Sequence, residues 1–442
     1  MLATLVTAVV NGLRGELVRV EIDVAPGLPV CHIVGLPDAA LSEARERVRA
    51  AIRNSGFEYP NSRITVNLAP ADRPKRGAAY DLAIAVGILV ASGQIGRGGG
   101  SWALLGELSL AGTVQPVTGV LPMVATLSRA GHRRIGVPAA NLAEASVVAG
   151  LELVALDGLD DAARLIAGPR GRTAGRAQRR VPLAVSGSPV VPAVGGGAES
   201  SAGGALTSGL EPVDLADVHG QRHARWALEV ALAGAHNLLM VGPPGAGKTL
   251  LARAIPGLLP PLTEEEALEV TVIESVAGLL DDPSARPRRP FRAPHHTSSY
   301  AALVGGGPAL LPGEVTLAHT GVLFLDELPE FDRNVLDALR QPLEEGTVSI
   351  ARARGRVRYS ARFQLVAAMN PCRCGHFGSA DRACRCPTGD AERYVQRISG
   401  PLLDRFDMRV HMTRVPPAQL LAGQPAEPSA AVGPRIAAAR RL

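Results

Sequence analysis

One stretch of this 442-residue chain decides its fold: Gly242-Pro243-Pro244-Gly245-Ala246-Gly247-Lys248-Thr249. Its glycines let successive backbone N–H groups turn toward a phosphate, and the start of the helix expected after the loop adds partial positive charge. Lys248 can reach the β- and γ-phosphates of a nucleoside triphosphate, and the Thr249 hydroxyl can bind Mg²⁺. Residues 237–241, apolar apart from the initial asparagine, predict a strand before the loop. Because strand, glycine loop and helix follow one another, we predict that all eight residues bind ATP.

A second strand carries the acidic side chains that such a site requires. Residues 321–325 are apolar apart from the initial glycine, and Asp326 and Glu327 follow them. Ligands bind at the carboxyl ends of strands in open α/β sheets. Asp326 is expected to hold Mg²⁺ through water, and Glu327 to orient and polarise the attacking water. An apolar strand that ends in Asp-Glu is often only structural, so the functional interpretation depends on the phosphate loop upstream.

Two further side chains are candidates for completing the site. Asn370 follows residues 363–369, which are apolar apart from Gln364, and its amide could position the lytic water or sense the γ-phosphate; the alternative is a turn residue before proline. Arg405 is the candidate for an arginine that reaches the γ-phosphate bound by a neighbouring subunit, an effect on the order of 10³–10⁵ in rate. The alternative for Arg405 is a salt bridge to Asp404 or Asp407.

Arginine alternates with other residues along 349–359 and predicts a hairpin with one basic face. The four arginines are Arg352, Arg354, Arg356 and Arg358. Such a face can bind the phosphates of a DNA strand in a sequence-independent and salt-sensitive way. The alternative is an exposed hairpin whose arginines pair with acidic residues of a neighbouring subunit.

Four of the five cysteines form two Cys-x-Cys pairs: Cys372, Cys374, Cys384 and Cys386. Four thiolates can complete a tetrahedral Zn²⁺ site, although the usual spacing is Cys-x-x-Cys. His376 is a candidate substitute ligand. The other interpretation is four reduced thiols in a loop.

The composition indicates a globular chain of more than one domain. Hydrophobic residues make up 46% and charged residues 20%, which excludes a largely disordered chain. The net charge of +5 permits a polyanionic partner without requiring one. No apolar run reaches the ~20 residues of a membrane span, and no basic residue precedes the apolar N-terminal run. We therefore predict a cytoplasmic protein with no membrane partner.

Sequence patterns divide the chain into four parts. Residues 1–167 combine strand patterns with helix patterns and predict an α/β domain that includes one strand around 103–108. Residues 168–212 are rich in Gly, Pro, Ser, Ala and Arg and predict a flexible linker. Residues 213–416 predict a second α/β domain, with a parallel sheet around the phosphate loop. Residues 417–442 form the last part.

Several motifs resemble the magnesium-chelatase-like AAA+ proteins and, within them, the ComM/YifB family. They are Phe-Arg-Ala-Pro-His-His-Thr at 291–297, Gly-Val-Leu-Phe-Leu-Asp-Glu-Leu at 321–328, Ala-Met-Asn-Pro-Cys at 368–372 and Ile-Ser-Gly-Pro-Leu-Leu-Asp-Arg at 398–405. The resemblance implies an AAA+ core in a hexameric ring, with a basic hairpin like that of the MCM helicases. It also implies an ATP-driven motor on branched DNA that aids integration of incoming DNA in natural transformation. Family members continue into a helical lid, of which residues 417–442 would be the truncated start.

The N-terminal region is similar to the catalytic fold of Lon proteases but lacks their catalytic pair. Lon proteins place a serine two residues after the glycine of a segment like Pro74-Lys75-Arg76-Gly77, and this chain has Ala79 there. The partner lysine would fall near 120–123, where there is none. Because a Ser–Lys dyad needs both nucleophile and base, we predict a non-proteolytic Lon-like domain.

One alternative function remains open beside the DNA motor. The chain could be the ATPase subunit of a metal-insertion complex of the magnesium-chelatase type, which would require a tetrapyrrole-binding partner and no DNA. The Lon-like N-terminal domain argues against it, because we expect chelatase subunits to start directly at the ATPase core.

Overall fold

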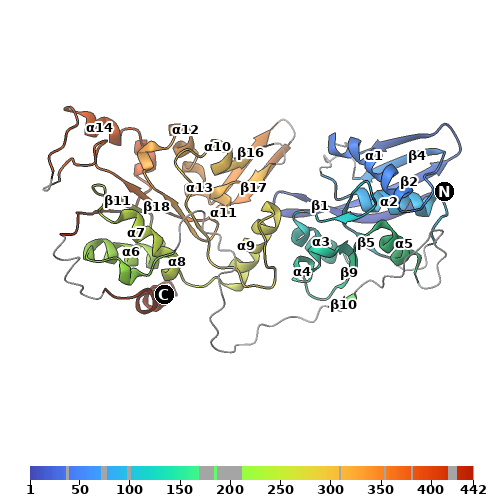
Figure 1. Cartoon of the computed structure of the whole chain (residues 1–442), viewed down its shortest axis with the longest axis horizontal. Coiled ribbons are helices and arrows are strands. Elements are labelled where there is room, and N and C mark those ends of the chain that lie inside the picture. The colour runs from blue at the N-terminus through green and yellow to red at the C-terminus, as the bar shows by residue number, and fades with distance from the viewer. Residues whose placement is uncertain are drawn as a thin grey trace. The chain divides into compact units, whose positions relative to one another are not determined.

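The structure, a computed structural model, describes residues 1–35, 39–70, 77–96, 101–168, 184–186, 212–307, 310–352, 355–379, 382–416 and 426–441. The chain forms two compact units (Figure 1). The first contains Met1–Glu199, Glu274–Ala285 and Arg352–Gly355, and the second contains Ser200–Ile273, Arg286–Ala351 and Arg356–Leu442. The linker expected at 168–212 lies outside the described residues except for 168, 184–186 and 212. No helix in the described ranges has the length and apolar character that a membrane span needs.

The first unit is built on a mixed sheet with the strand order β10-β9-β8-β5-β1-β2-β4-β3. Its long antiparallel hairpin pairs Leu2 with Asp23 at one end and Asn11 with Arg14 at the other. The strands are β1 (Leu2–Asn11), β2 (Arg14–Ala25), β3 (Val30–Val34), β4 (Arg63–Ala69), β5 (Ala103–Leu104), β8 (Arg134–Pro138), β9 (Glu152–Leu156) and β10 (Ala184–Ser186).

Helices form two separate apolar clusters with this sheet. One cluster includes α1 (Ala39–Asn54), α2 (Asp81–Ala91) and α5 (Leu159–Ala167). The other includes α3 (Val120–Arg129) and α4 (Leu142–Ala145). Every residue of α2 is buried, as its nearly continuous apolar sequence requires. The predicted α/β class is therefore confirmed for this unit.

The single strand expected around 103–108 is wrong. Only β5 joins the main sheet, while β6 (Glu107–Leu108) pairs with β7 (Val114–Gln115) in a separate hairpin. Gly106 separates the two strands at φ +152°, and a Cβ there would lie 2.7 Å from Cγ1 of Val114. The apolar run therefore changes direction at a position that only glycine fits.

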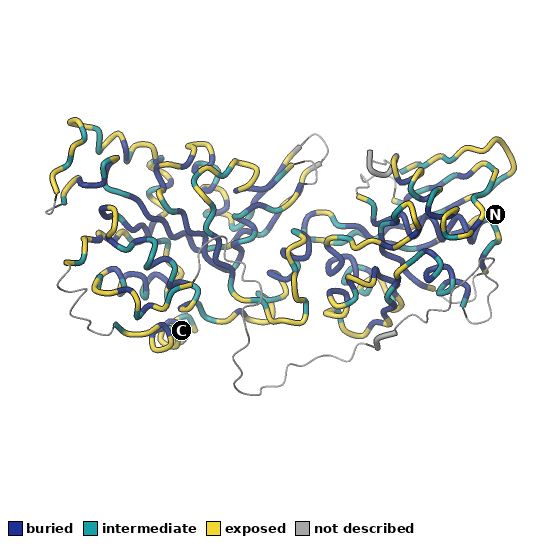
Figure 2. The backbone as a smooth tube through the Cα atoms, in the orientation of Figure 1, coloured by how far each residue is buried: buried dark blue, intermediate teal, exposed yellow. Residues whose placement is uncertain are grey.

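The second unit contains a five-stranded parallel sheet with the order β12-β15-β18-β11-β19. Its strands are β11 (Leu238–Val241), β12 (Phe291–Arg292), β15 (Val322–Leu325), β18 (Gln364–Met369) and β19 (Met408–His411). β15, β18 and most of β11 are buried, and buried residues are dark blue in Figure 2. β11 comes first in the chain but lies between β18 and β19, so chain order reverses there. Such a switch point is where α/β sheets place their ligands.

Short helices complete the second unit. α6 (Arg222–Gly234) precedes β11 in the chain, and α7 (Lys248–Arg253) follows it. The others are α8 (Ile255–Leu258), α9 (Glu264–Ala277, of which residues 274–277 belong to the first unit), α10 (Tyr300–Val304), α11 (Glu314–Leu317), α12 (Arg333–Asp337), α13 (Arg340–Glu345), α14 (Asp390–Val395), α15 (Gly400–Leu403) and α17 (Ser429–Ala439). Val432 and Ile436 of α17 pack in the same buried cluster as Leu228 of α6. Of the last part of the chain, residues 417–425 and 442 lie outside the described ranges.

Candidate functional site

The phosphate loop connects β11 to α7, as predicted. Gly245 and Gly247 adopt φ angles of +79° and +88°, in the left-handed region that glycine reaches without strain. Within the described residues, no atom beyond the two chain neighbours lies within 4 Å of a Cβ placed at either position, so glycine is required by the backbone conformation and not by crowding. α7 begins at Lys248, directly after this left-handed turn.

Lys248 lies at the centre of the site and donates to three neutral acceptors among the described residues. Its buried Nζ donates to the carbonyls of Gly242 (2.7 Å) and Pro243 (3.1 Å) and to Oδ1 of Asn370 (3.1 Å). Burial lowers the pKa of Lys248, and the carboxylates of Asp326 and Glu327 act in the opposite direction. The end of β18 thus contacts the phosphate loop through Asn370.

Thr249 and Asp326 bring the two halves of the predicted Mg²⁺ site together. The hydroxyl Oγ1 of Thr249 donates to Oδ2 of Asp326 at 2.6 Å, and the backbone N–H of Glu327 donates to Oδ1 at 2.9 Å. Hydroxyl and carboxylate oxygens are ligands that Mg²⁺ accepts, usually together with waters and substrate phosphates. The donor set therefore fits Mg²⁺.

Glu327 contacts a histidine to which the sequence analysis gave no role. The Glu327 side chain is about half exposed, and its Oε2 lies 3.5 Å from Nδ1 of His296. The His296 ring lies beside His295, with centroids 4.1 Å apart, and meets Phe331 edge-on at 6.4 Å. Because β12 pairs with β15 in parallel, residues just after both strands emerge at one sheet edge. The sequence signal for His296 is therefore the His-His dipeptide at 295–296, which follows a strand that pairs with β15. Recognising that strand pairing could have placed His296 near Glu327.

Arg405 lies in a separate ion pair. Its guanidinium bonds to Glu344 of α13, and not to Asp404 or Asp407. The Asp407 carboxylate instead accepts the backbone N–H of Asn237 at 2.7 Å. The structure therefore brings together Lys248, Thr249, Asp326, Glu327 and Asn370, and places Arg405 on Glu344.

The basic hairpin consists of β16 (Thr347–Arg352) and β17 (Gly355–Ser360), which form a two-stranded sheet. Arg356 and Arg358 are exposed, whereas Val357 and Tyr359 are buried. The alternation predicted for this segment therefore gives an arginine face and an apolar face. Arg354 and the side chain of Arg352 lie outside the described residues.

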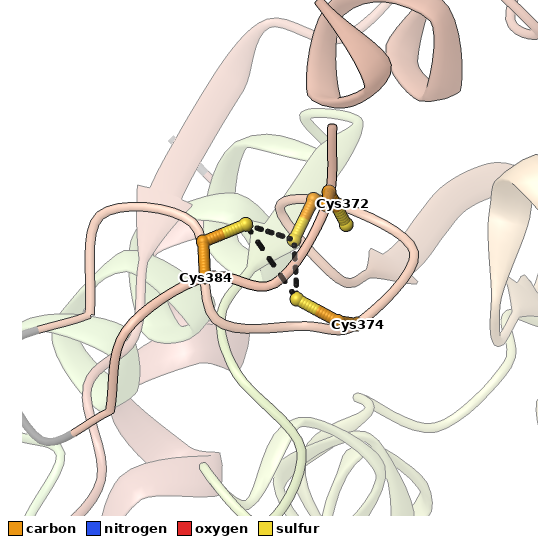
Figure 3. Close-up of side chains that lie close together, drawn as sticks. Cys372, Cys374 and Cys384 are labelled. Carbon is orange, nitrogen blue, oxygen red and sulfur yellow. Dashed lines mark hydrogen bonds between the residues drawn. The ribbon is translucent and has the colours of Figure 1, made fainter. Parts of the chain in front are cut away.

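The four clustered cysteines converge. The sulfur of Cys372 lies 3.4 Å from that of Cys374 and 3.7 Å from that of Cys384, and the last two are 3.6 Å apart (Figure 3). With Cys386, their ligand atoms all lie within 4.8 Å of one another. Backbone hydrogen bonds from Arg385 and His376 lower the pKa of Cys374 to about 6. These sulfurs are too far apart for a disulfide, whose bond is about 2.05 Å long.

Comparison with known proteins agrees with the motifs. A family model described as "Magnesium chelatase, subunit ChlI" matches residues 214–420, and one described as "Subunit ChlI of Mg-chelatase" matches residues 20–141. An uncharacterized protein of Mycobacterium tuberculosis, Rv2897c, is 46% identical over an alignment of 443 residues. The alignment covers 98% of this chain and 80% of that protein. YifB of Escherichia coli is 42% identical (97% and 79% covered), and competence protein ComM of Haemophilus influenzae is also 42% identical (98% and 80% covered).

The chain belongs to the ComM/YifB family of magnesium-chelatase-like proteins. Membership confirms the expected AAA+ ATPase type of the core. Lon protease 2 of Bacillus subtilis is similar over a shorter stretch, with 30% identity over 156 residues, 32% of this chain and 27% of that protein. The ComM/YifB relatives match nearly the whole chain, so the match covers both the phosphate loop and the N-terminal α/β unit.

Proposed function

We propose that the chain is a Mg²⁺-dependent ATPase. The observation that carries the proposal is the 2.6 Å hydrogen bond between Thr249 of the phosphate loop and Asp326 beyond β15. It joins, at one point, two oxygen ligands that are 77 residues apart in the chain. Mg²⁺, when bound there with ATP, would neutralise phosphate charge as the terminal phosphoryl group leaves.

The surrounding side chains suit the remaining tasks. Lys248 can transfer its hydrogen bonds from the loop carbonyls to the β- and γ-phosphates. Asn370 accepts a hydrogen bond from the same ammonium, so it can respond when the ammonium binds phosphate. The exposed Glu327 carboxylate can accept a proton from water. His296, which lies beside this carboxylate, holds the Glu327 side chain in its orientation. His296 is thus a positioning residue in this proposal.

The position of Arg405 leaves it able to act in a ring. Both members of its pair with Glu344 are about half exposed, and exposed ion pairs contribute only about 0–1 kcal/mol. Redirecting Arg405 to a phosphate of an adjoining subunit therefore costs little. We propose a hexameric ring in which each ATP is held by one subunit and completed by Arg405 of the next.

The hairpin and the relatives favour DNA as the substrate of the motor. Arg356 and Arg358 present positive charge to solvent from a strand anchored by its buried face. One relative is named as a competence protein. We propose an ATP-driven branch-migration helicase that supports recombination of incoming DNA in natural transformation.

The Lon-like unit serves this motor as a non-proteolytic scaffold in the proposal. Ala79, at the position of the Lon nucleophile, packs in the same buried apolar cluster as Val120 and Met123. The region where a dyad would be expected is therefore filled with apolar side chains, which can supply neither nucleophile nor base.

The second candidate function is the ATPase subunit of a metal-insertion complex. The descriptions of both matching family models favour it. It predicts an ATPase rate that is unchanged by DNA and raised by a tetrapyrrole-binding partner, so a DNA titration separates the two candidates.

Removing the basic face of the hairpin should uncouple the ATPase from DNA. In the variant with Arg352, Arg354, Arg356 and Arg358 changed to Ala, we expect forked DNA to no longer stimulate ATP hydrolysis. DNA affinity should fall at least about tenfold, and the slope of log K against log[salt] should shrink by about one for each phosphate that the hairpin no longer binds. Basal ATPase activity and ring size should stay unchanged, because the buried face of the hairpin is untouched.

A charge-matched control tests whether position matters. Arg333 and Arg393 are well exposed on α12 and α14, and the double variant R333A/R393A removes the same charge as R356A/R358A. ATPase rate and anisotropy with labelled forked DNA should respond to R356A/R358A alone. Equal DNA affinity in both double variants would disprove the hairpin assignment.

A further inference from the structure

The segment between β18 and α14 has the sulfur geometry of a metal site. We call residues 372–386 the cysteine loop. A tetrahedral Zn²⁺ with Zn–S bonds of about 2.3 Å separates its sulfurs by about 3.8 Å. The three sulfur–sulfur distances of 3.4, 3.6 and 3.7 Å in the cysteine loop are close to that value. The sulfur of Cys386 lies within 4.8 Å of the other three and could be the fourth ligand.

The donor set favours a thiophilic metal such as Zn²⁺. Four thiolates favour Zn²⁺ over Mg²⁺, which prefers oxygen. His376 is buried, but it is not part of the four-sulfur group. The described residues between Met369 and Asp390 contain no helix or strand. A bound metal would therefore fix the conformation of this loop, as backbone hydrogen bonds fix the conformation of helices and strands.

This loop lies directly against the phosphate loop. Gly375 follows the ligand Cys374, and a Cβ placed on it would be 2.4 Å from Cδ and 2.7 Å from Cγ of Pro244. The backbone of the cysteine loop thus packs on the ring of Pro244 without room for a methyl group. Cys372 also comes two residues after Asn370, which bonds to Lys248.

We propose that the four cysteines bind one Zn²⁺ and that the metal makes the cysteine loop a brace for the phosphate loop, so that zinc occupancy raises nucleotide affinity. The zinc site stands on the sulfur geometry alone, whereas the coupling also depends on the proposed nucleotide site. Coupling between two sites is commonly worth about 5- to 150-fold in affinity. Nucleotide affinity should therefore fall by about tenfold or more when zinc is lost.

Metal content and nucleotide binding together test the proposal. The full-length chain, expressed with added zinc and purified without chelator, should contain one zinc per chain by mass spectrometry of the metal. C384S/C386S should lose the zinc and bind a fluorescent ATP analogue about tenfold or more weakly. C31S, which changes a cysteine of β3, should match the wild type in zinc content and in affinity for the ATP analogue. A wild-type chain without zinc would disprove the site, and zinc loss with unchanged nucleotide affinity would disprove the coupling.

A pair of glycine variants tests the brace with the metal in place. Gly375 and Gly378 have similar φ angles of +81° and +72°, but among the described residues no atom beyond its two chain neighbours lies within 4 Å of a Cβ at Gly378. Both variants, G375A and G378A, carry the same backbone strain, and only G375A collides with Pro244. Zinc should stay bound in both, and G375A alone should weaken nucleotide binding, by about fivefold or more. Equal nucleotide affinities would overturn the brace; a wild type that holds zinc and binds no ATP would overturn the proposed function and leave the zinc site standing.

Discussion

Changing Lys248 to Ala is expected to abolish ATP binding at ordinary ATP concentrations. Its ammonium is buried and is held between loop carbonyls and Asn370, so the site is built around a compact positive charge. In the complex with ATP, the charge pair is the ammonium of Lys248 and a phosphate. Removing one partner of a buried charge pair costs about 2–5 kcal/mol, which weakens binding by about 30-fold to several thousand-fold. Titration with a fluorescent ATP analogue in the presence of Mg²⁺ measures this loss.

The control for this variant is Lys75→Ala, which changes the only other lysine in the sequence. It should bind ATP as the wild type does, and K248A should keep its thermal unfolding temperature within a few degrees. Near-normal ATP affinity of a folded K248A protein would show that the phosphate loop does not bind ATP.

Changing Glu327 to Gln should leave ATP bound but unhydrolysed. The amide keeps the size of the side chain and its approach to His296, and it cannot accept a proton from water. Loss of a general base lowers rates by about 10²–10⁴-fold. Single-turnover hydrolysis should fall by that factor, while ATP affinity stays within about threefold of the wild-type value, because Lys248, Thr249 and Asp326 are untouched.

Glu330→Gln is the matched control. Glu330 lies three residues after Glu327 and pairs with Arg397 at 3.1 Å, so its carboxylate has another partner. Its replacement should change turnover less than about tenfold. Wild-type turnover in E327Q would show that another group activates the water.

The central features of the candidate site could be predicted because their signals are local. The phosphate loop carries its turn glycines, its lysine and its hydroxyl within eight consecutive residues. The strands before Asp326 and Asn370 are short apolar runs, and each polar residue marks the strand end. Since parallel strands end at the same sheet edge, the contacts of Asn370 with Lys248 and of Asp326 with Thr249 follow from strand adjacency.

Other features depend on contacts that no local pattern encodes. The position of His296 beside Glu327 requires knowing that the two-residue strand β12 pairs with β15. The pairing of Arg405 with Glu344 joins residues 61 apart, although acidic residues lie next to Arg405 in sequence. The closeness of Gly375 to Pro244 depends on the path of the cysteine loop over the phosphate loop. The break at Gly106 within 103–108 likewise depends on the packing of Val114.

The central claim, that each ATP is held by one subunit and completed by Arg405 of its neighbour, is tested most directly by mixing two inactive variants. R405A keeps the phosphate loop and K248A keeps the arginine, so about a quarter of the interfaces in a randomly mixed ring would regain both. Each variant alone should hydrolyse ATP about 10³-fold or more slowly than the wild type, and the equimolar mixture should recover a measurable fraction of the wild-type rate. A mixture of ring-forming variants that is no more active than its components would contradict the claim.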